Sequence, residues 1–554
     1  MASLNPLQGV LGHRKAAHLL RRTTFRFTKP KVDQLSVLTI DQALDNLLQT
    51  YPLKQAQPLY TDFQNNPPLA TNYAWINPPG TALPSGVQDF MTRRFVVAWW
   101  LDEAQNDPGI SHKMAFFFHQ FNITTLNTSS TNSFFDYLAL MRWGGLGNFK
   151  KLATKIVMDN VMLRYLDNTT NNKNNPNENF AREFLELFTI GKGPQVAPGD
   201  YTNYTEDDIV QAARVFTGFK TRIQRDQIDP ETNLPRGTVQ FAQHDTGAKT
   251  FSPRFQNTTI AGATNAAGML TELDAFVTMV FNQPETAKNL CRRLYHCFVS
   301  PNITAEIEND IIGPLSQVLR NNNFEMKPTL RALLSSQHFF DADDSDNKDE
   351  ILGALIKSPL ELALQSITFF GMPIPDPLTQ QQQFYRTFYG AAVQDRMMSP
   401  QNLPLFQAAD VAGYPAYYQE PDFSRQWFTS LTIVGRYKMP EMLLSGRQVL
   451  GANPNGQIGS RINSPVWVRD SGVVSNPADP AVLVSDILKY LLPEEVDADR
   501  FNYFLNKVFL DGLPAQDWTY EWEAYINTNV DTEVRLALDR FLRLVLSSPE
   551  YQTF

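Results

Sequence analysis

Apolar residues recur at three- and four-residue spacing through most of this chain, which is the pattern of helices that bury one face. The clearest segments are 89–105, 131–143, 148–166 and 533–552. Strand patterns are few and short. Because the chain has 554 residues and 43% of them are apolar, it can bury one large core or two to three smaller ones. The sequence therefore predicts a mainly α, large multi-helix globular protein.

One segment departs from the helical pattern. Between Phe219 and Gly262 the sequence alternates and is rich in threonine, which predicts a small β-hairpin insertion near residues 220–262. Just before it, Thr205 precedes an acidic first turn and an apolar run, so we expect Thr205 to cap a helix.

An internal boundary is suggested by the acidic stretch 341–350. We interpret this stretch as a solvated turn between two packed units, with a calcium loop as the alternative. The prediction is one integrated unit over 1–554. A soft boundary near 341–352 divides it into an N-terminal helical part, 1–340, and a C-terminal helical part, 353–554.

Charge and hydropathy exclude several classes of partner. The net charge is −9, the isoelectric point is near 5.4, and Lys and Arg are scattered, so the chain lacks the basic patch of a nucleic-acid binder. No stretch approaches the ~20 apolar residues of a membrane span. The first thirty residues also lack the apolar run of a signal peptide. We expect no nucleic-acid partner, no transmembrane segment and no visible leader.

The two cysteines, Cys291 and Cys297, are six residues apart in a segment with helical spacing. A helix separates such a pair by about 9 Å along its axis, which is too far for a local disulfide. We therefore predict two free thiols on a buried helix face.

Signatures of several enzyme classes are missing. The chain has no His-Glu-x-x-His zinc helix, no Gly-x-Ser-x-Gly elbow, no Walker loop and no dinucleotide-binding glycine pattern after a strand. The Gly191-Lys192-Gly193 run is interpreted as a helix C-cap. Protease, lipase, ATPase and dehydrogenase functions are therefore disfavoured.

The segment 165–191 has the strongest polar pattern of the chain, an amide-rich loop followed by an amphipathic helix. On that helix Glu183 and Glu186 share one face, and Arg182 points away from it. Two carboxylates on one face can chelate a cation or divide acid and base roles. The alternative is an ion-pair network with arginines from neighbouring helices.

The loop before this helix holds Asp167, Asn168 and Asn177 among many asparagines. Their oxygens can wrap a hard cation such as calcium. The alternative is ordinary turn chemistry, since the spacing of a calcium loop is absent.

Histidines supply the remaining candidates. His119 lies in an aromatic helical segment, where it is either a hydrogen-bonded core residue or a ligand, and His18 has the same two interpretations. Arg21 and Arg22 follow His18 by three and four positions and are candidate partners of Glu183 or Glu186.

His244 and Asp245, with Lys249 four residues on, place an imidazole, a carboxylate and an ammonium in one short loop. That combination suits proton transfer. A stabilised turn is the alternative.

Several blocks of the sequence together resemble one bacterial family. They include AAHLLRRTTF, KMAFFFHQF, PNENFAREFLELFTIG, YTEDDIVQAARVFTGF, FAQHDTGAKTF and DVAGYPAYY. In these blocks the chain resembles a divergent member of the bacterial domain-of-unknown-function family 1800, over nearly its whole length.

The resemblance implies a context rather than a reaction. Members look like exported proteins, which implies a periplasmic, secreted or cell-surface location. Their genes tend to lie beside domain-of-unknown-function family 1501, whose fold is similar to alkaline phosphatases and sulfatases. A protein of that kind is therefore an expected partner, with self-assembly as the other expectation.

Departures from the family pattern bear on metal chemistry. The family's helix commonly reads Trp-His-Asn-His-Phe, whereas here Phe118 replaces the Trp and Phe121 replaces the second His. His112 stands where a Glu is usual, and Tyr414 replaces a Trp. A two-His metal site on that helix is not available, so the resemblance disfavours a catalytic metal here.

Two hypotheses follow. In the first, this is a partner-dependent binding or assembly protein whose Glu, His, Arg and Asn residues form a buried structural cluster. In the second, it is a hydrolase- or oxidoreductase-type enzyme that uses the cluster as an acid/base or metal site, with calcium or a transition metal as the possible divalent cation. The catalytic candidates are Glu183, Glu186, His119, His244 and Asp245. The network candidates are His18, Arg21, Arg22, Asp167, Asn168, Asn177, Arg182 and Lys249.

Overall fold

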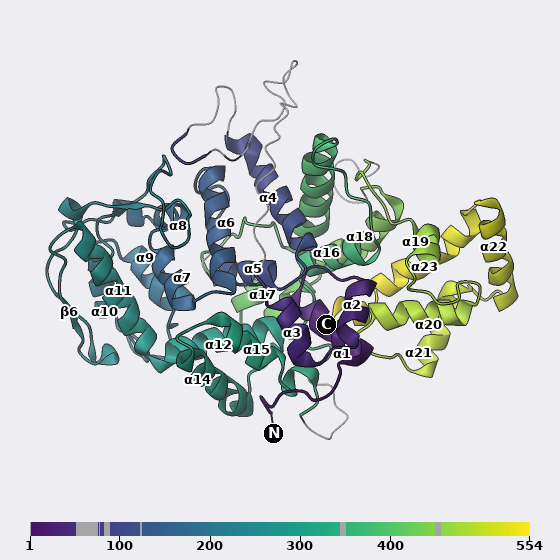
Figure 1. Cartoon of the computed structure of the whole chain (residues 1–554), viewed down its shortest axis with the longest axis horizontal. Coiled ribbons are helices and arrows are strands. Elements are labelled where there is room, and N and C mark those ends of the chain that lie inside the picture. The colour runs from purple at the N-terminus through teal and green to yellow at the C-terminus, as the bar shows by residue number, and fades with distance from the viewer. Residues whose placement is uncertain are drawn as a thin grey trace, which may run out of the picture.

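The computed structural model describes residues 2–50, 76, 78–81, 89–121, 124–343, 351–448 and 456–554. In these residues helices dominate, and the strands form three two-stranded antiparallel sheets (Figure 1). The predicted mainly α, multi-helix fold is confirmed.

Helices of the N-terminal part begin near the middle of the molecule and then extend toward one end of it (Figure 1). In chain order they are α1 (Gly12–Thr23), α2 (Lys29–Ser36), α3 (Ile40–Leu47), α4 (Asp89–Asn106), α5 (Ser111–Phe121), α6 (Thr131–Gly145), α7 (Phe149–Ile156), α8 (Asn160–Tyr165), α9 (Glu178–Glu183), α10 (Glu206–Val215), α11 (Ala266–Asn282), α12 (Pro284–Phe298), α13 (Ala305–Ile307), α14 (Gly313–Asn321) and α15 (Met326–Leu334).

Helices of the C-terminal part also begin near the middle of the molecule and then extend to its opposite end (Figure 1). They are α16 (Pro359–Phe369), α17 (Pro415–Tyr418), α18 (Ile433–Ser445), α19 (Ser464–Asp470), α20 (Pro480–Leu491), α21 (Ala498–Asn502), α22 (Ala515–Thr528), α23 (Thr532–Leu546) and α24 (Pro549–Gln552). Most of the acidic stretch 341–350 lies outside the described residues. The boundary near 341–352 therefore stays a prediction.

The strands are very short. They are β1 (Gln195–Ala197), β2 (Asp200–Tyr201), β3 (Phe219–Lys220), β4 (Thr238–Val239), β5 (Lys249–Thr250) and β6 (Thr259–Ile260). The β3–β4 and β5–β6 pairs fall in the predicted insertion and confirm it, with Phe219 opposite Val239 and Lys249 opposite Ile260. The β1–β2 pair lies before the predicted insertion and was not expected.

Local signals explain where several helices begin. The Thr205 side chain accepts a hydrogen bond from the Asp208 amide and the Asp208 carboxylate accepts one from the Thr205 amide, which confirms the predicted cap of α10. Ser358 and Glu361 form the same reciprocal cap on α16. Helix α12 has proline at its first position, where a missing N–H costs nothing.

Segments that are distant in sequence meet in the middle of the molecule. The C-terminus lies beside α1 and α2 in Figure 1. The Phe554 amide donates to the carbonyl of Leu355 over 3.0 Å. Gln365 of α16 donates to the carbonyl of Arg21 in α1 over 2.7 Å. The centre is therefore built from the first, middle and last parts of the chain.

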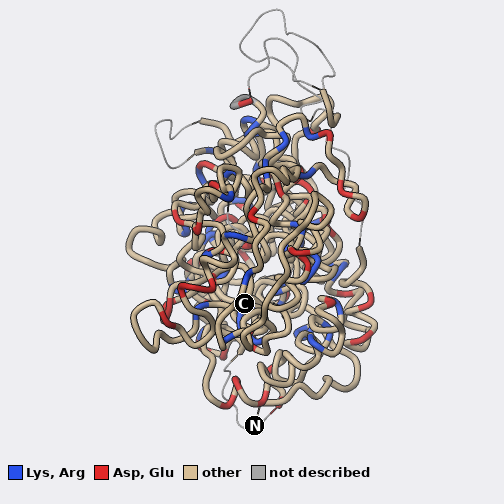
Figure 2. Tube along the Cα trace, turned by 90° about the vertical axis from the view of Figure 1, so that its left-hand side faces the viewer, with Lys and Arg blue, Asp and Glu red and all other residues tan. Residues whose placement is uncertain are grey.

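Charged residues of both signs intermingle along the chain trace (Figure 2). Among the described helices, none combines the length and apolarity that crossing a bilayer requires. Both cysteines are free thiols on α12; Cys291 is buried and Cys297 is half-buried.

Candidate functional site

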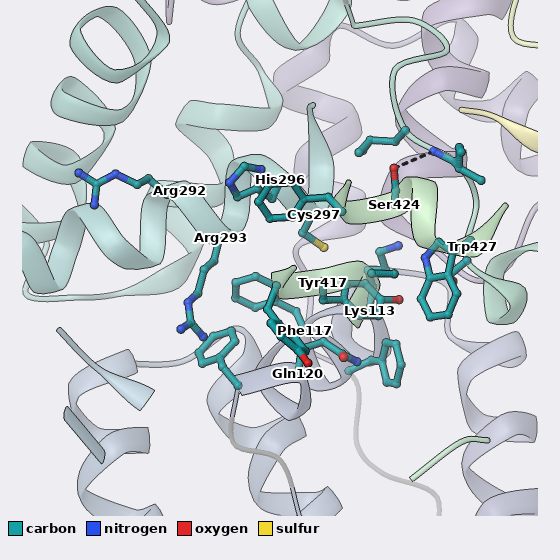
Figure 3. A pocket seen from close by; sticks show the side chains of 18 of the residues that line it. Lys113, Phe117, Gln120, Arg292, Arg293, His296, Cys297, Tyr417, Ser424 and Trp427 are labelled. Carbon is teal, nitrogen blue, oxygen red and sulfur yellow. Dashed lines mark hydrogen bonds between the residues drawn. The ribbon is translucent and has the colours of Figure 1, made fainter. Parts of the chain in front are cut away.

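A cavity of about 260 Å³ lies in the middle of the molecule between α5 and α12 (Figure 3). Helix α17 and the short 3₁₀ helix Phe423–Trp427 form its third side. Further lining residues are Leu187, Leu355, Ile356, Ser358, Glu361, Ala412, Glu420 and Phe554. The walls thus come from both sides of the boundary that the sequence suggests.

Helices α5 and α12 face the cavity with the same spacing. On α12 the lining residues are Asn289, Arg292, Arg293, His296 and Cys297, and on α5 they are Lys113, Phe116, Phe117, Gln120 and Phe121. In both helices the positions are i, i+3, i+4, i+7 and i+8, which is one helical face. The opposite face of α12 is buried in the core.

The two adjacent arginines of α12 differ in their partners. Arg292 forms ion pairs with Glu308, at 2.6 Å between Nη2 and Oε1, and with Glu285. The Arg293 guanidinium lies 4.6 Å from the centre of the Phe121 ring. No residue that the structure describes accepts a hydrogen bond from it or pairs with its charge. Burial lowers the pKa of Arg293 to about 10.

Gln120 is the second polar group without a partner at the cavity. Its side chain is only 8% exposed, and within the described chain neither its Nε2 nor its Oε1 has a hydrogen-bond partner. A buried amide that lacks partners costs roughly 1–3 kcal/mol of stability. Gln120 and Phe121 are neighbours at the C-terminal end of α5, so Gln120 and Arg293 lie at the same end of that helix.

The other end of α5 carries a neutralised pair. Lys113 and Glu361 form a buried ion pair, and the second Glu361 oxygen accepts a hydrogen bond from the Ser358 amide at 2.7 Å. Burial lowers the pKa of Lys113. Whichever member of the pair holds the proton, the pair as a whole carries no net charge.

His296 and Cys297 are uncharged at neutral pH. His296 stacks on Phe423 with ring centres 4.2 Å apart, and its Nδ1 donates to the Ser300 carbonyl at 3.3 Å. Burial lowers the pKa of His296 to about 4. Burial also raises the pKa of the Cys297 thiol, an effect that Lys113 opposes. The cavity therefore has no activated thiolate and no charged imidazole.

Aromatic rings form the third wall and the opening. Tyr417 meets Phe116 and Trp427 edge to face, with ring centres 6.0 Å and 5.6 Å apart. Tyr418 and Glu420 are exposed and mark the side that opens to solvent.

None of the residues predicted as a site lines this cavity. His119 is the nearest in sequence, one position before Gln120. Its Nδ1 lies 2.8 Å from the Tyr137 hydroxyl, and its ring packs against Phe406. Burial lowers the pKa of His119 to about 3. The structure therefore places His119 in the core.

Arg21 and Arg22 do not pair with Glu183 or Glu186, and that prediction was wrong. Arg22 donates to the Phe298 carbonyl at 2.8 Å, and Arg21 donates to the carbonyl of Tyr490. Their guanidinium groups satisfy carbonyls at helix ends that sequence spacing does not reveal.

His18, which precedes this arginine pair on α1, also bonds to backbone. Its Nε2 donates to the carbonyl of Phe339 at 2.9 Å. Burial, and next the charge of Arg22, holds the pKa of His18 well below its usual value.

Arg182 and Glu186 of the amphipathic helix have local partners. Arg182 forms a two-bond pair with Glu206 at 2.6 and 2.8 Å. Glu186 contacts Lys192 at 3.3 Å and accepts from the Tyr204 hydroxyl at 3.1 Å. Burial, and next the charge of Glu186, raises the pKa of Glu183 to about 7.

This helix nevertheless borders the cavity. Leu187 lines it and lies four residues after Glu183.

The asparagine-rich loop is held by its own amides. Asn168 donates to the Phe216 carbonyl at 3.3 Å and accepts from Asn171 at 3.0 Å. The Asn177 amide N–H donates to Asn171, while the Asn177 side chain caps α9. Asp167 is exposed. These bonds match the turn-chemistry alternative.

The loop of His244 forms a buried cluster around a residue that sequence analysis missed. Glu272 of α11 lies 3.0 Å from His244 Nε2 and 2.6 Å from Lys249 Nζ. Asp245 instead pairs with Arg214 at 2.8 Å. The available signal for this contact was a glutamate at helical spacing from Met269 and Phe276, which places it on the apolar face of α11.

Metal ligands do not gather in the described residues, where no group of three or more His, Cys, Asp or Glu is placed to hold an ion. A family model described as "Protein of unknown function (DUF1800)" matches residues 18–553. No curated protein matches the chain, and no solved structure matches it.

Proposed function

Because this chain belongs to the family described as "Protein of unknown function (DUF1800)", whose description assigns no reaction, we propose a function from its own cavity: the protein binds a small molecule with an apolar body between α5 and α12. The resemblance seen in the sequence is confirmed by the family match. The family match assigns no reaction, partner or location to the protein.

The observation that carries the proposal is the unpaired amide of Gln120 at a cavity wall. Buried amides in folded proteins are almost always hydrogen-bonded, because an unpaired one costs stability. A bound molecule with one polar group supplies the missing partner. Ligand cavities typically combine apolar walls with a few such polar groups.

The size and walls of the cavity define the kind of molecule. A volume of about 260 Å³ lies near the lower end of the several hundred Å³ typical of small-molecule sites. Phe117, Tyr417 and Trp427 supply flat apolar surface, which favours an apolar ligand body. The proposed ligand is therefore a small organic molecule with an apolar body.

Binding is favoured over the hydrolase or oxidoreductase alternative by the state of the ionisable groups. His296 is neutral, Cys297 stays a thiol, and Lys113 is paired with Glu361. General acid–base catalysis works best with a group that titrates near the working pH and reaches the substrate. Lys113, whose pKa burial lowers to about 8, titrates nearest to neutral pH, but Glu361 holds it in a buried ion pair instead of leaving it free to reach a substrate.

The expectations of a protein partner, of self-assembly and of an exported location stay predictions. A role in partner-dependent binding is compatible with a cavity ligand that stabilises one conformation of the central helices. Size-exclusion chromatography of the purified protein tests self-assembly independently of the cavity.

Calorimetric titration with two uncharged probes, 3-phenylpropanamide and octanamide, tests the proposal. We expect saturable one-to-one binding of at least one probe to the wild type. Ala416 lines the cavity and is 5% exposed, so Ala416→Leu fills part of the space. This variant should lose binding while it keeps its melting temperature within a few degrees. Absence of binding by both probes to a folded wild type would contradict the proposal.

A further inference from the structure

We infer that the natural ligand of this cavity is a monocarboxylate with an apolar body, whose carboxylate is held by Arg293 while Gln120 hydrogen-bonds beside it. The inference rests on the proposed function and names the class of ligand. It uses two polar cavity groups: the Gln120 amide, which has no hydrogen-bond partner among the described residues, and the Arg293 guanidinium, which faces the Phe121 ring.

The two adjacent arginines of α12 differ in how far their charges are neutralised. Arg292 has two glutamate partners, whereas Arg293 faces the ring of Phe121 and has no carboxylate partner in the described part of the chain. A guanidinium taken out of water needs a counter-charge or hydrogen-bond acceptors to offset its desolvation. Arg293 is half-buried at the cavity wall, so its desolvation in the free protein is partial, and a ligand carboxylate would complete its burial and supply the counter-charge.

The Phe121 ring offsets only part of this cost. A guanidinium over an aromatic face gains roughly 0.5–2 kcal/mol, yet a ring offers no strong acceptor for the five N–H donors. Arg293 is thus held in place in the free protein while its donors remain available. A carboxylate accepts two parallel hydrogen bonds from such a fork.

The remaining charges in the cavity favour a single negative charge on the ligand. Lys113 and Glu361 cancel each other, and His296 is neutral. Glu420 is exposed at the opening, where water screens its charge. Arg292, which also lines the cavity, is offset by Glu285 and Glu308, so Arg293 is the lining cation without a carboxylate partner among the described residues. A phosphate monoester carries about −1.5 to −2 at neutral pH and leaves excess negative charge, so a carboxylate fits better.

The position of the polar groups orients the ligand. Gln120 and Arg293 lie at the C-terminal end of α5, and Lys113 lies seven residues earlier, about 10 Å along the helix. Phe117 and Trp427 line the space with apolar surface. The carboxylate therefore lies at the Gln120 end, and the apolar body packs against the aromatic rings (Figure 3).

Isothermal titration calorimetry with matched probes tests the inference. The carboxylates are 3-phenylpropanoate and octanoate, their neutral counterparts are the two amides used above, and phenyl phosphate represents a dianion. We expect each carboxylate to bind the wild type at least ten times more tightly than its amide. We expect phenyl phosphate to bind less tightly than 3-phenylpropanoate.

Substitution of the arginine identifies the group responsible. Arg293→Gln should weaken carboxylate binding by roughly 10- to 100-fold and change amide binding by less than about threefold. Arg293→Lys keeps the charge but loses the forked pair of donors. Its affinity for the carboxylates should therefore fall between those of the wild type and Arg293→Gln. Arg543→Gln, an exposed arginine of α23, is the control and should leave both affinities unchanged. Circular dichroism and melting temperature verify that each variant is folded.

The outcomes separate this inference from the proposed function. Amides that bind as tightly as the acids, or an Arg293→Gln variant that retains the preference for acids, would overturn the inference and leave the cavity as a binding site for neutral molecules. Tighter binding of phenyl phosphate than of 3-phenylpropanoate would also overturn it. If neither acids nor amides bind, the proposed function fails as well.

Discussion

The cluster around Glu272 and the cavity beside Gln120 both bury polar side chains, but their groups are satisfied to different degrees. His244 and Lys249 share the carboxylate of Glu272, which also accepts a hydrogen bond from the Ala263 amide at 2.7 Å. At the cavity, Gln120 and Arg293 have no such partners among the described residues. A closed network contributes to the fold, whereas unpaired groups at a cavity wall indicate a ligand. The following substitutions test this distinction.

Glu272→Gln should have the largest effect on stability. It leaves the buried Lys249 ammonium without its counter-charge, and losing one partner of a buried pair costs roughly 3–5 kcal/mol. Urea denaturation measures the free energy of unfolding. Glu308→Gln, which removes a half-exposed partner of Arg292, is the matched control and should cost about 1 kcal/mol or less. Equal losses in the two variants would remove the distinction between a closed network and a surface pair.

Gln120→Leu should instead raise the stability of the protein. It replaces an unpaired amide with an apolar group of similar size, so the ligand-free protein should gain about 1 kcal/mol. Gln365 is the matched control, since its amide donates to the carbonyls of Arg21 and Thr24. Gln365→Leu should lose roughly 1–3 kcal/mol. A loss of stability in Gln120→Leu as large as in Gln365→Leu would mean that the Gln120 amide has a partner within the protein.

Glu183→Gln should have the smallest effect, and one that depends on pH. The folded pKa of Glu183 is raised to about 7 from 4.5, so the folded protein binds the proton more tightly than the unfolded chain does. Stability from this group is therefore fully present below pH 4.5 and declines as the pH rises to about 7.

Glu183→Gln lacks this loss of stability at rising pH. It should match the wild type at pH 4.5 and exceed it at pH 8, by no more than about 1 kcal/mol because Glu183 is partly exposed. Melting curves at both pH values measure the difference. A variant that is less stable than the wild type at pH 8 would show that the ionised carboxylate stabilises the fold.

Local features of the fold were predictable from sequence because they depend on neighbouring residues. Thr205 and Asp208 lie three apart, so the cap of α10 could be foreseen, and the alternating pattern between Phe219 and Gly262 indicated the β pairs. The partners of Arg22 could not be foreseen, because they are backbone carbonyls more than 270 residues away.

The sequence prediction named a residue next to the cavity lining but no residue that lines it. The sequence favoured His119 because histidine is a common ligand, but its neighbour Gln120 is one of the five α5 residues that line the cavity. The shared spacing of Lys113, Phe117 and Gln120 was visible in the sequence. That α12 lies opposite them was not visible, because it depends on packing between distant segments.

Protection of Cys297 from a thiol reagent tests most directly whether the cavity is a binding site. Cys297 lines the cavity and is half-buried, while Cys291 is fully buried in the core, so methyl methanethiolsulfonate should modify Cys297 alone. Mass spectrometry of the digested protein follows the rate at each cysteine. The account predicts that 3-phenylpropanoate slows modification of Cys297 in a saturable way in the wild type. In Ala416→Leu it should leave the rate unchanged. An unchanged rate in the wild type at millimolar ligand would contradict the account.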